Sequence, residues 1–115
     1  MEPKDVFILE SIIELCDRIS DSVKRYGDSF EVFDHDLDFQ DACELRIVQI
    51  GENVNSLSDN FKNSNPEISW RNIVGTRNII VHDYGVISNQ KVWEVIKTDI
   101  PKLRDFCAGI ISQHD

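Results

Sequence analysis

Apolar residues recur every three or four positions along the first 26 residues, which is the spacing of one face of an amphipathic helix. The apolar positions are Val6, Leu9, Ile12, Ile13, Cys16, Ile19, Val23 and Tyr26. Gly27 follows directly and is a typical residue at the C-terminal end of a helix. The pattern therefore predicts a first helix that ends at Gly27.

An acidic stretch between residues 28 and 41 separates this helix from the next apolar pattern. Its upstream part is expected to be a loop, and Asp36 or Asp38 is expected to cap the following helix. The second helix has a wide apolar arc, so we expect it to be the most buried element. Its apolar residues are Phe39, Ala42, Cys43, Leu45, Ile47, Val48, Ile50, Val54 and Leu57. Gly51 weakens this helix by roughly 1 kcal/mol relative to alanine, and we expect it to let another helix approach closely.

The second half of the chain continues with helical patterns. Residues 58–66 are expected to form a connection with a short helical turn around Phe61, and a third helix should run from the cap Ser69 to about His82, with its stop at Gly85. A fourth helix follows Ser88, and Pro101 either kinks it or opens a fifth segment. Strand-like alternation of useful length is absent from the sequence. We therefore predict a single all-α domain over residues 1–115, built as a four- to five-helix antiparallel bundle.

Composition supports an ordinary globular protein, with 41% hydrophobic and 29% charged residues. No apolar run approaches the roughly 18 residues that cross a bilayer, and the start MEPKDVFILE lacks the basic flank and apolar core of a secretory signal. The three cysteines, Cys16, Cys43 and Cys107, are far apart and lie among aliphatic neighbours, so we expect reduced core residues. A cytoplasmic protein without membrane association is the simplest interpretation.

The net charge of −9 is unevenly distributed. Residues 1–69 hold 6 Lys/Arg against 16 Asp/Glu, a balance of −10, whereas residues 70–115 hold 6 against 5, a balance of +1. A broad basic groove for duplex DNA is therefore not expected, and any RNA contact should be local and short. His35 and His114 have no spacing relation to His82 that indicates a metal site, so neither a metal nor a cofactor is expected.

The stretch RNIIVHDY carries the candidate chemistry, because it places Arg77, His82 and Tyr84 within eight residues. An arginine fork suits phosphate oxygens, and a histidine can take or give a proton near neutral pH. Together they could cleave RNA by transesterification without a metal. Asn78 is expected to brace this site, while Asp83 either orients His82 or faces water. The alternative is structural: a surface arginine, a histidine at a helix end and a packed tyrosine.

Spacing adds a constraint on this site. Arg77 and His82 are five residues apart, which places them about 140° apart around a regular helix. Either the helix unwinds near His82, or a second copy of the chain completes the site. A two-fold dimer would bring two arginines and two histidines into one cleft, so we predict a homodimer with the third helix at its interface.

The motif resembles the HEPN superfamily, and most closely its HepT-like branch, whose signature is an arginine and a histidine separated by four to six residues and extended to H-x-Y. Arg77, His82 and Tyr84 match it. Further similarity lies at residues 50–54 (IGENV), 66–70 (PEISW), 92–93 (VW) and 100–103 (IPKL). Two positions depart from the family pattern: Ser69 replaces the usual proline, and Thr76 stands where methionine is common.

The resemblance implies a homodimeric toxin of a toxin–antitoxin pair, acting as a metal-independent endoribonuclease on mRNA or tRNA. Arg77 and His82 of both protomers would share one cleft. The implied partner is a nucleotidyltransferase of the MntA type, which would silence the toxin by transferring AMP from ATP onto Tyr84. Two alternatives remain at this point. One is a non-catalytic HEPN subunit that binds a nucleotide for a partner nucleotidyltransferase, and the other is a structural helical adaptor.

Overall fold

The computed structural model describes residues 1–82 and 87–114. Within these residues the chain is helical and contains no strand. The α-helices are α1 (Pro3–Tyr26), α2 (Phe30–His35), α3 (Leu37–Ser56), α4 (Asp59–Ser64), α5 (Trp70–His82), α6 (Asn89–Glu94) and α7 (Ile100–His114), with a π-helical turn (Val95–Asp99) between α6 and α7. The all-α class predicted from the sequence is confirmed.

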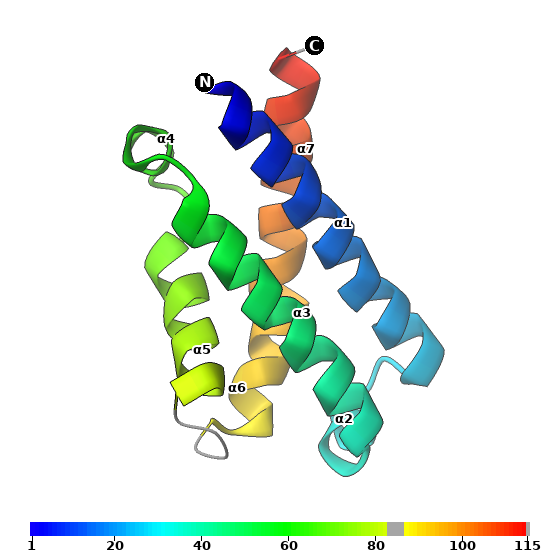
Figure 1. The fold of residues 1–115 in the computed structure, drawn as a ribbon. Helices are drawn as coiled ribbons and strands as arrows, with labels where there is room; N and C mark the ends of the chain where they lie inside the picture. The colour runs from blue at the N-terminus through cyan, green and yellow to red at the C-terminus, as the bar shows by residue number, and fades with distance from the viewer. Residues whose placement is uncertain (83–86, 115) are drawn as a thin grey trace.

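Four long helical rods form the bundle (Figure 1). They are α1, α3, α5 and the continuous rod made by α6, the π-helical turn and α7, and each runs antiparallel to the rod before it in the chain. The particle measures 42 × 28 × 20 Å, so its long axis follows the helices. Both termini and α4 lie at one end, whereas α2 and the C-terminal end of α5 lie at the other.

The ends of α1 and α3 follow local sequence signals. Gly27 has φ of 129°, a conformation that favours glycine, and its N–H donates to the carbonyl of Val23 at the end of α1. At the start of α3, the Asp36 side chain accepts a hydrogen bond from the backbone N–H of Phe39 at 3.1 Å. Of the two caps considered, Asp36 is therefore the one in place.

The expectation of a loop upstream of α3 is wrong, because residues 30–35 form the short helix α2. Phe33 of this helix is fully buried, and its ring meets Phe39 edge to face at a centroid distance of 5.0 Å and lies 5.4 Å from Trp93. A helix of six residues is not stable alone. Aromatic packing against α3 and α6 holds α2 in place, and a local sequence pattern does not report such contacts.

The last rod of the bundle contains Pro101 and remains helical around it, because a π-helical turn directly precedes this proline. Proline lacks an N–H and its ring clashes with the carbonyl four residues earlier, which here belongs to Lys97 inside that turn. The wider turn accommodates this clash, and Pro101 lies in the first turn of α7. The rod continues without a break in helical conformation, since Val95 and Ile100 both have αR dihedrals.

Most of the residues predicted to form the apolar faces of the helices are buried in the core. The three cysteines are among them, and all three are free. Burial raises the pKa of each thiol to about 12, with Cys107 and Asp17 adding to the effect at Cys16. Leu45 departs from expectation: it is 52% exposed, so the apolar arc of α3 is narrower than its sequence indicates. In the described residues, no helix combines the length and apolar character needed to cross a bilayer.

Candidate functional site

The aliphatic stem of Arg77 lies against the backbone of α3 at Gly51. A Cβ atom placed on Gly51 would lie 2.4 Å from Cβ and 2.7 Å from Cγ of Arg77, distances at which atoms overlap. The close approach of another helix that was expected at Gly51 is therefore present, and the approaching helix is α5. Glycine at residue 51 fixes how near the arginine stem comes to α3.

The guanidinium group of Arg77 is oriented by its neighbour in the chain. Nη1 donates to Oδ1 of Asn78 at 2.9 Å. Nε is buried and has no hydrogen-bond partner within residues 1–82 and 87–114, and no carboxylate of these residues forms an ion pair with Arg77. The described part of the chain thus leaves the charge of Arg77 unneutralised, which suits a group that binds phosphate.

His82 is the last residue of α5 and is exposed. The helix is regular up to this residue, so the unwinding considered for the region near His82 does not occur before it. Asn78 lies four residues before His82, about 40° away around the axis and hence on the same face. Because Arg77 donates to Asn78, its guanidinium is drawn toward the helix face that carries His82.

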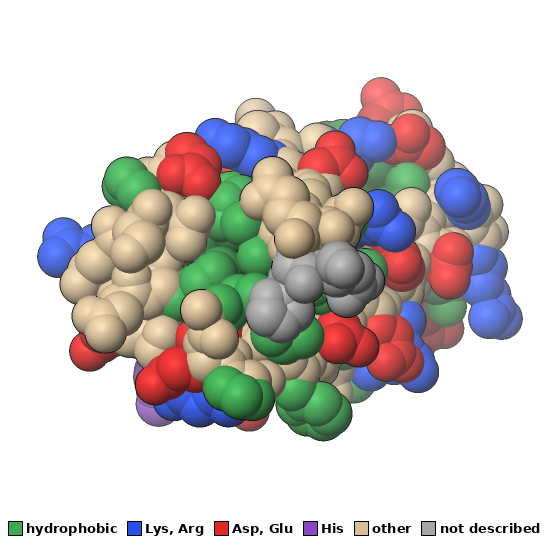
Figure 2. Space-filling model, turned by 90° about the horizontal axis from the view of Figure 1, so that it is seen from above, with side chains coloured by type: hydrophobic (Ala, Val, Ile, Leu, Met, Phe, Trp, Pro, Cys, Tyr) green, Lys and Arg blue, Asp and Glu red, His purple; other side chains and the backbone are tan. Residues whose placement is uncertain are grey.

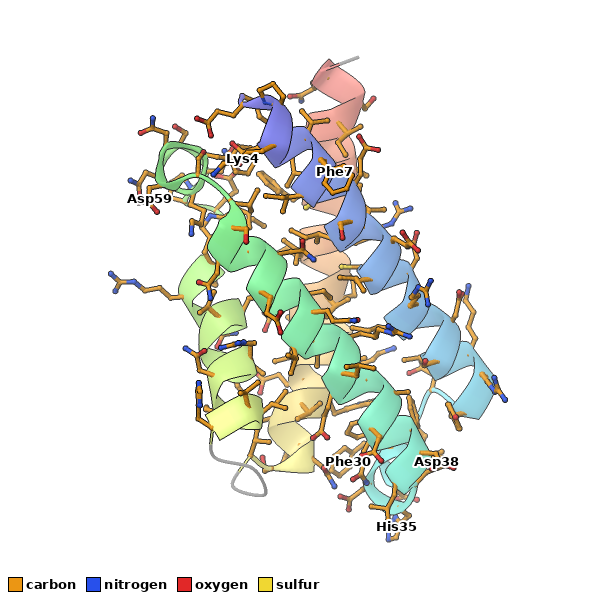
Figure 3. The ribbon with its side chains drawn as sticks, in the orientation of Figure 1. Lys4, Phe7, Phe30, His35, Asp38 and Asp59 are labelled. Atoms are coloured by element: carbon orange, nitrogen blue, oxygen red, sulfur yellow. The ribbon has the colours of Figure 1, made fainter. Side chains whose placement is uncertain are left out.

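The sequence predictions for Asp83 and Tyr84 lie outside the residues that the structure describes. His35, which lies at the same end of the bundle as Phe30 and Asp38 (Figure 3), has its Nδ1 atom 2.8 Å from the carbonyl oxygen of Glu31 within α2. Among the described side chains, no three His, Cys, Asp or Glu residues gather closely enough to hold a metal ion.

Two apolar residues beside the motif are exposed on α5. Ile79 is 36% and Val81 is 42% exposed, although both belong to the aliphatic run between Arg77 and His82. Ile80, between them, is buried in the core. The run therefore supplies one core contact and, on the two flanks of α5, one exposed apolar side chain each.

Sequence reasoning missed two basic residues, Lys62 and Arg71, which line a groove that reaches Asn78. A signal was present in the sequence. Arg71 and Asn78 are seven residues apart, and this spacing places both on one face of the third helix.

Comparison with known proteins identifies the family. The family described as "Ribonuclease HepT-like" matches residues 8–110, which include the Arg77–His82 motif and the Gly51 contact. No solved structure matches the chain significantly.

Several curated relatives carry ribonuclease names. "Putative RNase TTE0752" of Caldanaerobacter subterraneus subsp. tengcongensis is 33% identical over 95 residues, covering 83% of each chain. "Probable ribonuclease HepT" of Thermococcus cleftensis is 31% identical over 96 residues, covering 84% of this chain and 86% of the relative. "Putative RNase MJ1380" of Methanocaldococcus jannaschii is 27% identical over 81 residues, covering 63% and 74%. Together with the helical bundle, these matches show that the chain belongs to the HepT-like ribonuclease family of the HEPN superfamily.

Proposed function

We propose that this chain is a metal-independent endoribonuclease and the toxin of a toxin–antitoxin pair, acting on mRNA or tRNA in the cytoplasm. The observation that carries the proposal is the state of Arg77. Its stem is fixed against Gly51, its head is oriented by Asn78, and no described carboxylate neutralises it. An arginine held in this way is preorganised for a phosphate rather than for an internal ion pair.

The reaction is transesterification of the RNA backbone. The ribose 2′-oxygen loses its proton to a base and forms a bond to phosphorus. The bond from phosphorus to the 5′-oxygen breaks, and an acid delivers a proton to the departing oxygen. His82 acts as the base or the acid, and Arg77 stabilises the charge that develops on the phosphate. The products are a 2′,3′-cyclic phosphate and a 5′-hydroxyl, and this route requires no metal ion.

Two histidines would divide the work of base and acid, which favours a homodimer. Within one chain, Arg77 and His82 lie about 140° apart on a regular helix. The exposed apolar side chains of Ile79 and Val81 lie about 200° apart around α5, so Ile79 on the His82 side or Val81 on the Arg77 side would meet a second copy next to the motif. A two-fold axis there would place two arginines and two histidines at one cleft.

Tyr84 would serve as the switch of this site. A partner nucleotidyltransferase of the MntA type would join its phenolic oxygen to the α-phosphorus of ATP and release pyrophosphate. The resulting AMP group adds bulk and negative charge two residues from His82, where the RNA phosphate must bind. The support for this step is the H-x-Y extension of the motif in a chain of the HepT-like family.

The test compares purified wild type, shown by intact mass to be free of AMP, with Arg77→Ala and His82→Ala on total tRNA and on an unstructured mRNA fragment. Wild type should yield fragments ending in 2′,3′-cyclic phosphate in the presence of EDTA, and both variants should lose at least about 100-fold in kcat/KM. The proposal is wrong if unmodified wild type leaves both RNAs intact and His82→Ala does not relieve growth arrest. A nucleotide-binding accessory subunit would instead bind ATP or AMP without cutting RNA.

A further inference from the structure

A groove runs between α5 and the segment formed by the end of α3 and α4. Its two adjoining parts have volumes of about 410 and 490 Å³ and share Lys62, Asn63, Trp70 and Arg71 in their linings. Each part falls in the range of roughly 300–1,000 Å³ that is common for ligand pockets. The groove is thus large enough to hold more than one small chemical group along its length.

The α5 wall of this groove is a single helix face. Arg71, Val74, Gly75 and Asn78 all line it, and their spacing of three, four and seven residues is that of one stripe along a helix. His82 continues the stripe, because it lies eleven residues after Arg71, about 20° away around the axis. A chain that follows the groove along α5 therefore reaches Asn78, which binds Arg77, and then His82.

The charges in the groove favour an anionic ligand. Lys62 from α4 and Arg71 from α5 line it, and Arg71 makes no ion pair with any described residue. Among the described residues of the lining, Asp59 is the one that is acidic. Its carboxylate lies 3.9 Å from Lys62 Nζ and its side chain is 94% exposed, so it offsets Lys62 weakly. Figure 3 places Asp59 on α4, at the end of the bundle away from His35.

The remaining lining fits nucleotides. Asn55, Asn63 and Asn78 offer amide donors and acceptors, which can bind base edges and sugar hydroxyls. The indole N–H of Trp70 donates a hydrogen bond to the carbonyl of Asn65 at 3.0 Å, so the part of Trp70 that lines the groove is apolar. An acidic protein segment would use the two cations but would leave these amides without a matched set of partners.

We propose that this groove binds the single-stranded RNA segment that flanks the scissile phosphate, with Lys62 and Arg71 contacting backbone phosphates and the asparagines contacting bases and riboses. This inference rests on the proposed ribonuclease function. It adds the path of the substrate: along the stripe of α5 from Arg71 to Asn78, and on to Arg77 and His82. It also explains how a chain with a net charge of −9 would hold RNA through a short local contact.

The test measures binding separately from cleavage. A fluorescein-labelled single-stranded RNA of mixed sequence is titrated by anisotropy into the inactive His82→Ala protein, with and without Lys62→Gln plus Arg71→Gln, across a range of salt. The double change should weaken binding at least about tenfold and reduce the slope of log K against log salt by about 1.4. Lys24→Gln plus Lys102→Gln is the matched control, because it removes the same charge from exposed positions of α1 and α7 outside the groove.

A second pair of variants tests shape without changing charge. A Cβ on Gly75 or on Gly109 would meet no atom within 4 Å, so either glycine can be replaced without overlap. Gly75→Leu would project into the groove and should weaken RNA binding, whereas Gly109→Leu on α7 should not. Asp59→Asn should tighten binding, because it removes a negative charge from the lining.

The outcomes separate this inference from the ribonuclease proposal. If wild type cleaves RNA but the groove variants bind RNA as the His82→Ala parent does, the groove inference is wrong and the ribonuclease proposal stands. If no RNA is cleaved but binding depends on Lys62 and Arg71, the groove is an RNA-binding site, and the ribonuclease proposal and the assignment of a scissile phosphate are wrong. The groove inference is also overturned if the groove variants lose only an acidic protein partner, or if Gly75→Leu changes the oligomeric state by light scattering, since the groove would then be a protein contact.

Discussion

Gly51 of α3 and Arg77 of α5 are in such close contact that a methyl group on the glycine would overlap the arginine stem, 2.4 Å from its Cβ. The two residues are 26 positions apart in the chain, and each is ordinary when considered alone. Because they are in contact, the distance between α3 and α5 and the position of the Arg77 guanidinium depend on each other. A change at Gly51 should therefore affect both stability and chemistry.

Gly51→Ala should separate α3 from α5 or displace Arg77, lowering the free energy of unfolding by about 1–3 kcal/mol and reducing ribonuclease activity. Urea denaturation and RNA cleavage measure the two effects. Gly109→Ala is the control for both measurements and Gly75→Ala, in the proposed RNA groove, for stability alone, because their added Cβ atoms meet no atom within 4 Å and alanine favours a helix by about 1 kcal/mol. Equal stability of the Gly51 and Gly75 variants would contradict the overlap.

Subunit mixing tests whether two copies share one site. Arg77→Ala and His82→Ala should each be inactive alone, whereas a mixture that has exchanged subunits should recover part of the activity. The reason is that a mixed dimer would still present one arginine and one histidine at the shared cleft, so one of the two proton transfers would keep its catalyst and only part of the activity would return. RNA cleavage before and after subunit exchange is the measurement. If native mass spectrometry confirms exchange and the mixture is as inactive as its components, the two copies do not share one site.

Asp5 ties the first turn of α1 to the start of α4. Its carboxylate is buried and accepts hydrogen bonds from the N–H of Ser58 at 3.0 Å and the hydroxyl of Ser58 at 2.8 Å. The Ser58 hydroxyl in turn accepts from the N–H of Phe61 and caps α4. Asp5→Ala should cost about 1–3 kcal/mol of unfolding free energy and speed amide hydrogen exchange in α4. Asp21→Ala, at an exposed position of α1, should change neither.

The cysteine thiols predict a loss of stability in alkali. Their folded pKa is about 12, above the ordinary value of 9.0, because burial disfavours the thiolate. The stabilisation is therefore complete below pH 9 and is lost as the pH rises toward 12, since the unfolded chain releases these protons first. The slope should approach about 1.4 kcal/mol per pH unit for each thiol.

Urea denaturation at pH 8, 9 and 10 checks this dependence, and Cys43→Ala should reduce the slope by the share of one thiol. At pH 8 a thiol reagent should label the folded protein only as fast as it unfolds. Rapid labelling of native protein would contradict the burial of the three side chains.

The features predicted correctly from the sequence depend on short-range signals. Periodicity located α1, α3 and α5, and the predicted cap Asp36 acts through a hydrogen bond to the backbone three residues away. The features that were missed depend on contacts across the bundle. The helix α2 exists because Phe33 packs on Phe39 and Trp93, and Leu45 is exposed because no element covers that side of α3 among the described residues.

In the candidate site, too, local spacing predicted some features, whereas others depend on contacts between helices. Spacing alone placed Arg77 and His82 on different faces of one helix, which is correct for a regular helix. It could not show that Asn78 draws the guanidinium toward the His82 face, because a rotamer depends on packing against Gly51. Lys62 contributes to the groove from a separate helix, so its nearness to Arg71 is a property of the fold.

The arrangement of the ends has a practical consequence for experiments. Seen from the end that carries both termini, apolar side chains are visible in a hollow among neutral and acidic groups (Figure 2), and the lining there includes Met1, Phe61 and Ile110. A tag or fluorophore fused to either terminus would crowd α4 and the Asp5–Ser58 bonds, yet would stand most of a 42 Å axis away from His82. Reporters for RNA binding are therefore better attached to the RNA, with the protein left untagged.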